Sequence, residues 1–127
     1  MAVRVLVVDD QPPFRMAATA VVEATEDFEV IGEVETGEAA VEAARELLPD
    51  LILMDVNLPG INGLEATRQI LAAATEDPPV VVVVLSTYEA SEYAPRAAEA
   101  GAASYIPKSE FSPDRLEEAW RAAKAAA

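Results

Sequence analysis

The sequence has 127 residues, of which 23 are acidic and 9 are basic, so its formal net charge at pH 7 is −14. Hydrophobic residues make up 52% of it, enough for one core, and we treat residues 1–127 as a single domain. The acidic charge disfavours direct binding to nucleic acid or to anionic membranes. The sequence contains no cysteine and no histidine, which excludes disulfides, thiol nucleophiles and imidazole metal ligands within this chain.

The first residues run straight into a strand-like segment and lack the layout of a signal peptide. The longest run of branched apolar residues, 80–85, is far shorter than the roughly 20 residues of a membrane helix. We therefore expect a soluble, cytoplasmic domain.

The first half of the chain alternates between strand and helix patterns. Residues 3–8 form an almost continuous β-branched run, typical of a strand buried on both faces. A helix is expected after Pro13, and a second helix should open at Gly37 and end before Pro49. Between them, residues 28–35 alternate apolar and acidic side chains, as an edge strand does. The expected inward faces of the two helices are Phe14, Ala17, Ala18, Val21 and Val22, then Ala40, Ala44, Leu47 and Leu48.

The second half repeats the same alternation. Short apolar runs predict strands, and Pro59-Gly60 predicts a turn after the first of them. Ser112 and Pro113 suit the N-cap and first turn of a last helix, which buries Leu116, Ala119, Trp120 and Ala123. The expected strands are 51–54, ending at Asp55, then 80–85 and 102–106; the expected helices before the last are 63–74 and 90–100, the second weakened by Pro95.

Five β-α repeats with nearly continuous apolar strands predict an α/β fold. Helices should cover both faces of a five-stranded parallel sheet, which makes a three-layer, doubly wound domain. Right-handed crossovers favour the flavodoxin-like strand order 2-1-3-4-5, in which residues 28–35 lie at the edge.

Polar side chains follow four of the predicted strands. In the expected order these strands are neighbours, so their carboxyl ends share one edge of the sheet, where ligands bind in such folds. Taken singly, each residue has an ordinary explanation as a turn, a helix cap or a solvated side chain. The residues are Asp9, Asp10, Asp55, Asn57, Ser86, Thr87 and Lys108.

Three carboxylates at one edge repel each other and need a cation at neutral pH. Oxygen ligands without cysteine or histidine favour Mg²⁺ or Mn²⁺, and Lys108 adds a fixed positive charge for an anion. An aspartate beside such a metal can attack phosphorus and form an acyl phosphate. A hydroxyl at Ser86 could then bond the new phosphoryl oxygen.

These segments together resemble the receiver (phosphoacceptor) domain of two-component response regulators, over essentially the whole chain. Residues 28–34 and 62–66 look most like the NarL/FixJ (LuxR-type) branch. The segments that carry the resemblance are Val7-Val8-Asp9-Asp10, Leu53-Met54-Asp55-Val56-Asn57-Leu58-Pro59-Gly60, Gly63-Leu64-Glu65, Leu85-Ser86-Thr87 and residues 101–108.

The resemblance implies a role for each matching position. Asp55 would be the phosphorylated residue, and Lys108 would bind the phosphoryl group. Mg²⁺ would be held by Asp9, Asp10 and Asp55 together with the backbone carbonyl of Asn57. The phosphoryl donor would be a sensor histidine kinase or a small phosphodonor.

The resemblance also implies a switch. Ser86 would be the switch hydroxyl and Tyr105 the rotating aromatic, while Asn57 and Thr87 would contact the phosphoryl group. Residues 11–15 would meet the kinase. Phosphorylation would alter the face formed by the fourth helix, fifth strand and fifth helix and favour a homodimer or another partner, with DNA reached only through an output domain outside this sequence.

Two residues depart from the commonest family pattern. Pro107 precedes Lys108, whereas many receivers have proline after the lysine, so the geometry of the Lys108–Ser109 bond stays open. Thr87 is bulkier than the usual alanine or glycine and narrows access to the phosphoryl group.

Two other functions compete with this interpretation. An aspartyl-phosphate phosphatase of the haloacid-dehalogenase type needs a second carboxyl as general acid, but Asn57 stands there. A flavodoxin-like cofactor binder needs a phosphate loop after the first strand, where Asp9 and Asp10 would repel phosphate. The sequence leaves open whether the native protein is a stand-alone receiver or continues into a helix-turn-helix domain.

Overall fold

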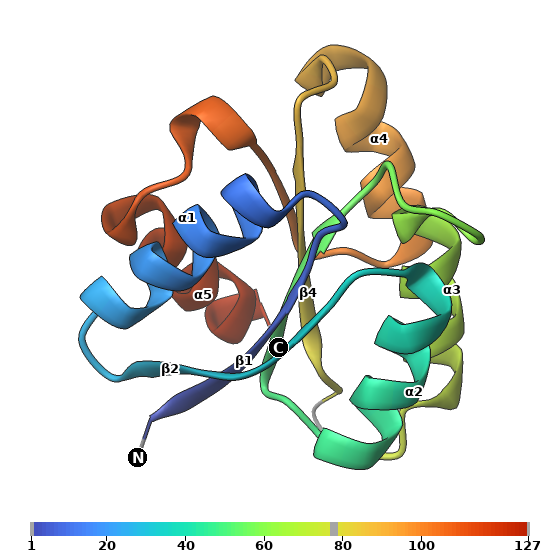
Figure 1. Cartoon of the computed structure of the whole chain (residues 1–127), viewed down its shortest axis with the longest axis horizontal. Coiled ribbons are helices and arrows are strands. Elements are labelled where there is room, and N and C mark those ends of the chain that lie inside the picture. The colour runs from blue at the N-terminus through green and yellow to red at the C-terminus, as the bar shows by residue number, and fades with distance from the viewer. Residues whose placement is uncertain (1, 77–78, 127) are drawn as a thin grey trace.

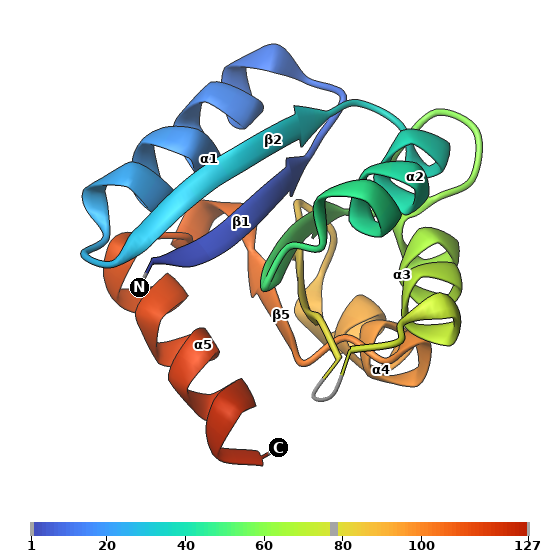
Figure 2. The same cartoon turned by 90° about the horizontal axis from the view of Figure 1, so that it is seen from below.

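The computed structural model describes residues 2–76 and 79–126 and contains one parallel five-stranded sheet. Its order is β2-β1-β3-β4-β5, as predicted, and the edge position of β2 agrees with its alternating sequence. Figures 1 and 2 show α1 and α5 on one face of this sheet and α2, α3 and α4 on the other. The strands are β1 (Val3–Val8), β2 (Phe28–Val34), β3 (Leu51–Asp55), β4 (Val81–Ser86) and β5 (Ser104–Pro107).

The helices agree with the predicted alternation to within one or two residues at most ends. Asn62 caps α3 by accepting a hydrogen bond from the Glu65 amide, and Ser112 accepts one from the Arg115 amide before α5. Within the described residues, no helix is long and apolar enough to cross a membrane. The helices are α1 (Pro12–Ala24), α2 (Gly37–Leu47), α3 (Gly63–Ala73), α4 (Ala90–Ala100) and α5 (Pro113–Ala126), with a short 3₁₀ turn, η1 (Lys108–Glu110), after β5.

The core lies on both sides of the sheet because successive strand residues point to opposite faces. Val5 and Val7 of β1 pack with α1 and α5, whereas Leu6 and Val8 pack toward α2 and α3. All four are at most 1% exposed. The strands are therefore fixed along their length, and the side chains that follow them are held at defined positions.

The expected inward face of α2 is wrong at its end. Leu47 is 36% exposed and Leu48 is 51% exposed. Leu48 adopts a left-handed backbone with φ of 48° and ends the helix. The Arg4 guanidinium donates to the carbonyl oxygens of Leu47 and Leu48, at 2.9 and 2.7 Å, and so ties this end of the helix to the start of β1.

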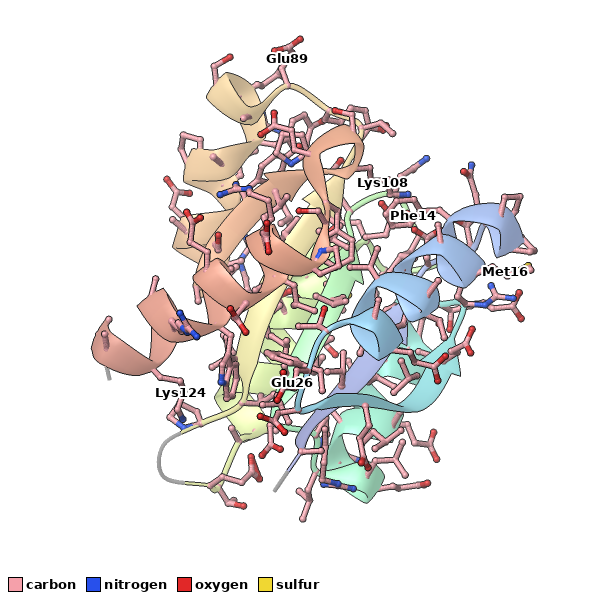
Figure 3. The ribbon with its side chains drawn as sticks, turned by 90° about the vertical axis from the view of Figure 1, so that its left-hand side faces the viewer. Phe14, Met16, Glu26, Glu89, Lys108 and Lys124 are labelled. Carbon is pink, nitrogen blue, oxygen red and sulfur yellow. The ribbon has the colours of Figure 1, made fainter. Side chains whose placement is uncertain are left out.

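Helices α1 and α4 also differ in one detail each from what the sequence predicts. Ala17 was expected on the inward face of α1 but is exposed, and Figure 3 shows its neighbour Met16 on the outer side of that helix. Pro95 lies inside α4, where it supplies no backbone N–H, yet the helix continues to Ala100 and ends at Gly101 with φ of 103°.

Candidate functional site

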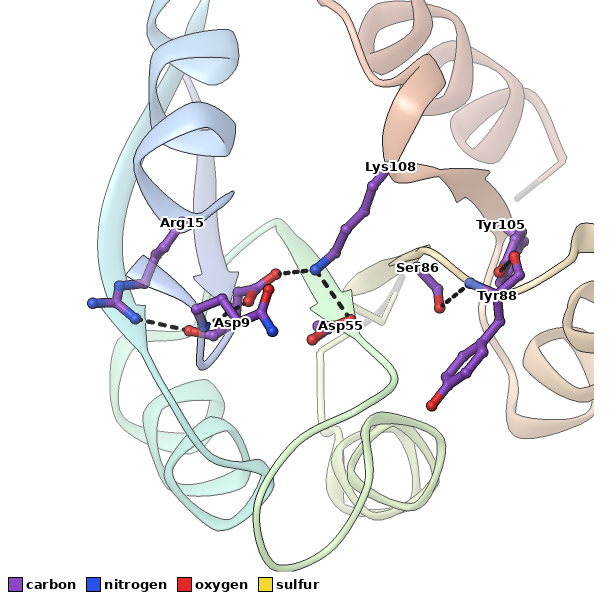
Figure 4. Close-up of polar contacts among 8 residues, drawn as sticks. Asp9, Arg15, Asp55, Ser86, Tyr88, Tyr105 and Lys108 are labelled. Atoms are coloured by element: carbon purple, nitrogen blue, oxygen red, sulfur yellow. Dashed lines mark hydrogen bonds and ion pairs between the residues drawn. The ribbon is translucent and has the colours of Figure 1, made fainter. Parts of the chain in front are cut away.

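Four neighbouring strands deliver the predicted site residues to one edge of the sheet. Asp9 follows β1, Asp55 ends β3, Ser86 ends β4, and Lys108 follows β5. Asp55 pairs in register with Leu85, the residue before Ser86. Figure 4 shows Asp9, Asp55 and Lys108 turned toward one another, with Ser86 beyond Asp55.

Three carboxylates meet at this edge. Asp9, Asp10 and Asp55 each offer an oxygen that lies within 4.8 Å of the oxygens offered by the other two. Asp9 is 2% exposed and Asp55 is 5% exposed, so both charges are shielded from water. Burial, reinforced by the nearby Asp9 charge, raises the pKa of Asp55 from 3.8 to about 6, against the opposing effect of Lys108. Such a cluster of hard oxygen ligands suits a hydrated divalent cation.

Lys108 is the cation within this cluster. Its Nζ lies 2.7 Å from Oδ2 of Asp9 and 3.5 Å from Oδ1 of Asp55, and its side chain is only 11% exposed. Among the described residues, Lys108 is the ammonium that contacts this cluster of three carboxylates, through Asp9 and Asp55, so the edge keeps a net negative charge. This net negative charge favours the binding of a metal cation. The Lys108 ammonium could also donate a hydrogen bond to an anionic group added to Asp55.

Asp9 also has a local structural role. Its Oδ1 accepts a hydrogen bond from the Gln11 amide at 2.9 Å, and its backbone carbonyl accepts one from the Arg15 guanidinium at 2.9 Å. Arg15 in turn contacts Glu33 and Glu35 of the neighbouring segment, each at 3.4 Å. One oxygen of Asp9 thus fixes the turn into α1, while the other faces Lys108.

The segment after β3 is fixed by close packing. The Gly63 amide donates to the Val56 carbonyl at 2.9 Å, and a Cβ at position 63 would collide with the backbone carbonyl of Asp55. Only glycine lets α3 begin this close to Asp55. Glu38 of α2 accepts a hydrogen bond from the Ile61 amide at 3.2 Å, which ties the same loop to a second helix.

Ser86 and Tyr105 are linked through Tyr88. The Ser86 hydroxyl accepts a hydrogen bond from the Tyr88 amide at 3.1 Å, and the Tyr105 hydroxyl donates to the Tyr88 carbonyl at 2.5 Å. The Tyr88 ring stacks on Tyr93 of α4, with ring centres 4.5 Å apart and planes 15° apart. The end of β4 is therefore connected to both β5 and α4 by way of one residue.

The structure separates the predicted residues into two groups. Asp9, Asp10, Asp55 and Lys108 form one compact cluster. The others surround it: Ser86 is buried, Tyr105 is half-buried on β5, and Asn57 and Thr87 are exposed.

Sequence reasoning missed the parts played by Tyr88, Arg15 and Phe14. Tyr88 bridges Ser86 and Tyr105, Arg15 holds the backbone of Asp9, and the ring of Phe14 lies against Lys108. The sequence places Phe14 in the core and within the segment 11–15 expected to meet the kinase, but it does not predict the contact with Lys108. No local pattern marks these contacts, because each depends on how side chains from different elements meet.

Comparison with known proteins now gives the family. The model of the response regulator receiver domain matches residues 5–121. Response regulator GacA of Pseudomonas aeruginosa is 42% identical over 106 residues, which cover 84% of this chain and 48% of that protein. The transcriptional regulatory protein DegU of Brevibacillus brevis is 37% identical over 117 residues, covering 92% and 48%. The chain thus spans about half the length of these curated relatives.

Solved structures give the same result. A LuxR-family response regulator from Aurantimonas sp. SI85-9A1 superimposes with a TM-score of 0.86 and 32% identity, covering 99% of this chain and 87% of that one. The response regulator domain of CheB from Thermotoga maritima superimposes with a TM-score of 0.85 and 32% identity, covering 98% of both chains. The predicted flavodoxin-like fold and the likeness to LuxR-type regulators are confirmed, and the chain belongs to the receiver domain family of two-component response regulators.

Proposed function

We propose that this receiver domain is a phosphorylation-dependent switch whose phosphoryl acceptor is Asp55. The observation that carries the proposal is a buried carboxylate with two acidic neighbours and one ammonium around it. A carboxylate oxygen of Asp55 forms the new bond to phosphorus while the bond between phosphorus and the donor breaks, and the donor leaves with the electron pair. Lys108 bonds the added phosphoryl group and offsets its charge.

Mg²⁺ fits the donor set at this site, with Mn²⁺ as an alternative. The oxygens of Asp9, Asp10 and Asp55 are close enough to share one ion, and the backbone carbonyl of Asn57 would supply a further ligand. When bound, the ion offsets the negative charge on the transferring group. Asp9 and Asp10 would hold that ion together with Asp55, and the ion would relieve the repulsion among the three carboxylates.

The phosphoryl donor is a sensor histidine kinase or a small phosphodonor, and the response reaches the α4-β5-α5 face. Ser86 turns from the Tyr88 amide to a phosphoryl oxygen, and Thr87 and Asn57 border the phosphoryl group. Because the Tyr88 carbonyl holds Tyr105, movement of this loop changes the surface of β5. The altered face then forms a homodimer, binds a partner protein or controls a DNA-binding output domain. The similarity to LuxR-type regulators supports the last of these outputs.

The test is phosphorylation by acetyl phosphate with Mg²⁺ in wild type and in Asp55→Asn. Wild type should carry one acyl phosphate per chain, and Asp55→Asn should carry none, because an amide is not a nucleophile toward phosphorus. Asp114→Asn removes an exposed carboxylate on α5 and should label like wild type. Intact mass and proteolytic mapping measure the result. Full labelling of Asp55→Asn would refute the assignment, and rapid release of many phosphates per chain would favour a phosphatase.

A further inference from the structure

The ring of Phe14 covers one side of the Lys108 ammonium. Nζ of Lys108 lies 4.3 Å from the centre of the Phe14 ring, while the same atom contacts Asp9 and Asp55. Figure 3 shows the two labelled residues beside each other, one from the first turn of α1 and one from the turn after β5. The ammonium is therefore held between an aromatic face and two carboxylates.

Both partners in this contact are themselves constrained. Phe14 is half-buried and packs against the core cluster between the sheet, α1 and α5. Lys108 is 11% exposed, although a lysine side chain has a long and flexible stem. Because the Phe14 ring is fixed by the core, it restricts the conformations that the Lys108 side chain can adopt.

We propose that Phe14 is a positioning residue that holds the Lys108 ammonium at the carboxylate edge by a cation–π contact. The ring attracts the charge through its electron-rich face and does not need a particular N–H donor. The cation–π contact between Phe14 and Lys108 therefore persists when the hydrogen-bond acceptor of Lys108 changes from a carboxylate to a phosphoryl oxygen. The inference rests on the proposed phosphorylation of Asp55 and adds to it a residue on α1 that controls the rate.

Simple core packing by Phe14 would give the same fold, so the two roles need separate tests. Phe28 offers a matched control because it packs against the same core cluster and meets Trp120 edge to face, with ring centres 6.3 Å apart. Loss of the Phe28 ring removes a core phenyl group from a position away from Lys108. A packing role predicts similar effects at the two positions, and a positioning role does not.

The first experiment replaces Phe14 site-specifically with mono-, di- and trifluorophenylalanine, which weaken the attraction for a cation while largely keeping the ring's shape. The rate of phosphorylation by acetyl phosphate at saturating Mg²⁺ should fall stepwise, by about threefold to tenfold over the series. Mg²⁺ affinity should stay within about twofold, because the carboxylates are unchanged. The same substitutions at Phe28 should leave the rate unchanged, Phe14→Tyr should retain it, and Phe14→Leu should lower it. A flat series at Phe14 overturns the proposal.

The second experiment measures the same contact without phosphorylation. The ε-methylene protons of Lys108 should show an upfield NMR shift from the ring current of Phe14 in wild type. This shift should disappear in Phe14→Leu and persist in Phe28→Leu. If wild type takes no phosphoryl group, the proposed function fails and these shifts alone decide whether Phe14 holds Lys108. An ordinary lysine shift in wild type overturns the positioning role whatever the phosphorylation result.

Discussion

Strand β3 contains four buried apolar residues followed by one buried carboxylate. Leu51 to Met54 are at most 1% exposed and pack in the hydrophobic core, whereas Asp55, one residue on, is 5% exposed and lies beside charged side chains. Leu53 and Asp55 lie on the same side of the strand because side chains alternate. The first region stabilises the fold through burial, and the second places a charge where water is scarce. Burial of the Asp55 charge disfavours the folded state, and the apolar packing of the preceding residues offsets this loss of stability.

The largest effect is expected in the apolar region. Leu53→Ala should lower the free energy of unfolding by about 2–5 kcal/mol, since the truncation leaves a cavity in a closely packed layer. Urea denaturation followed by circular dichroism measures it. Leu47→Ala is the control, because that leucine is 36% exposed at the end of α2 and should cost well under half as much. Equal losses at the two positions would contradict the packing described for β3.

The charged region should respond in the opposite direction. In metal-free protein at pH 8, Asp55→Asn should raise the free energy of unfolding by roughly 1–3 kcal/mol. The pKa of Asp55 is about 6 in the folded chain against 3.8 ordinarily, so the folded chain holds this proton more tightly. Its contribution to stability therefore falls as pH rises from about 4 to 6 and stays low above that range.

The same reasoning gives the pH signature. The advantage of Asp55→Asn should shrink as pH falls from 6 and should be lost below about pH 3, where the carboxyl is protonated in both the folded and the unfolded state. Urea titrations at several pH values in EDTA measure it. Asp114→Asn, which removes one exposed charge from the first turn of α5, should change the free energy of unfolding by less than about 1 kcal/mol throughout. A loss of stability in Asp55→Asn at pH 8 would show that the pairing with Lys108 outweighs the burial of charge.

Sequence patterns predicted the strands, their order and the polar edge for one physical reason. In a parallel sheet, each strand that ends in a polar residue delivers it to the same edge, so the position of Asp9, Asp55, Ser86 and Lys108 follows from periodicity and topology. No side-chain geometry is needed for that step.

The remaining features depend on contacts between distant residues. Leu48 ends α2 in a left-handed conformation, and Arg4, 44 positions earlier, donates to its carbonyl oxygen. The hydrogen bonds of Tyr88 and the approach of Phe14 to Lys108 depend on rotamers chosen when separate elements pack. Neither apolar periodicity nor residue type contains that information.

The smallest effect on stability, and the sharpest test of the charged edge, is expected from Ser86→Ala. The hydroxyl accepts one hydrogen bond from the Tyr88 amide, so its loss should cost only about 0.5–1.5 kcal/mol. Asp55 should still accept a phosphoryl group from acetyl phosphate, since Ser86 is not the nucleophile. The variant therefore separates formation of the acyl phosphate from the response to it.

That response should be weaker in phosphorylated Ser86→Ala than in phosphorylated wild type. In wild type the hydroxyl can give up the hydrogen bond that it accepts from the Tyr88 amide and donate one to a phosphoryl oxygen, and this difference between the two states biases the loop. Because Tyr88 also binds the Tyr105 hydroxyl, the exchange should appear as NMR shifts at Tyr88 and Tyr105 and as altered sedimentation. Thr75→Ala, which removes an exposed hydroxyl just after α3 and away from the carboxylate cluster, should preserve these changes. Identical spectra and sedimentation for phosphorylated wild type and Ser86→Ala would mean that the hydroxyl does not couple Asp55 to the β5 surface.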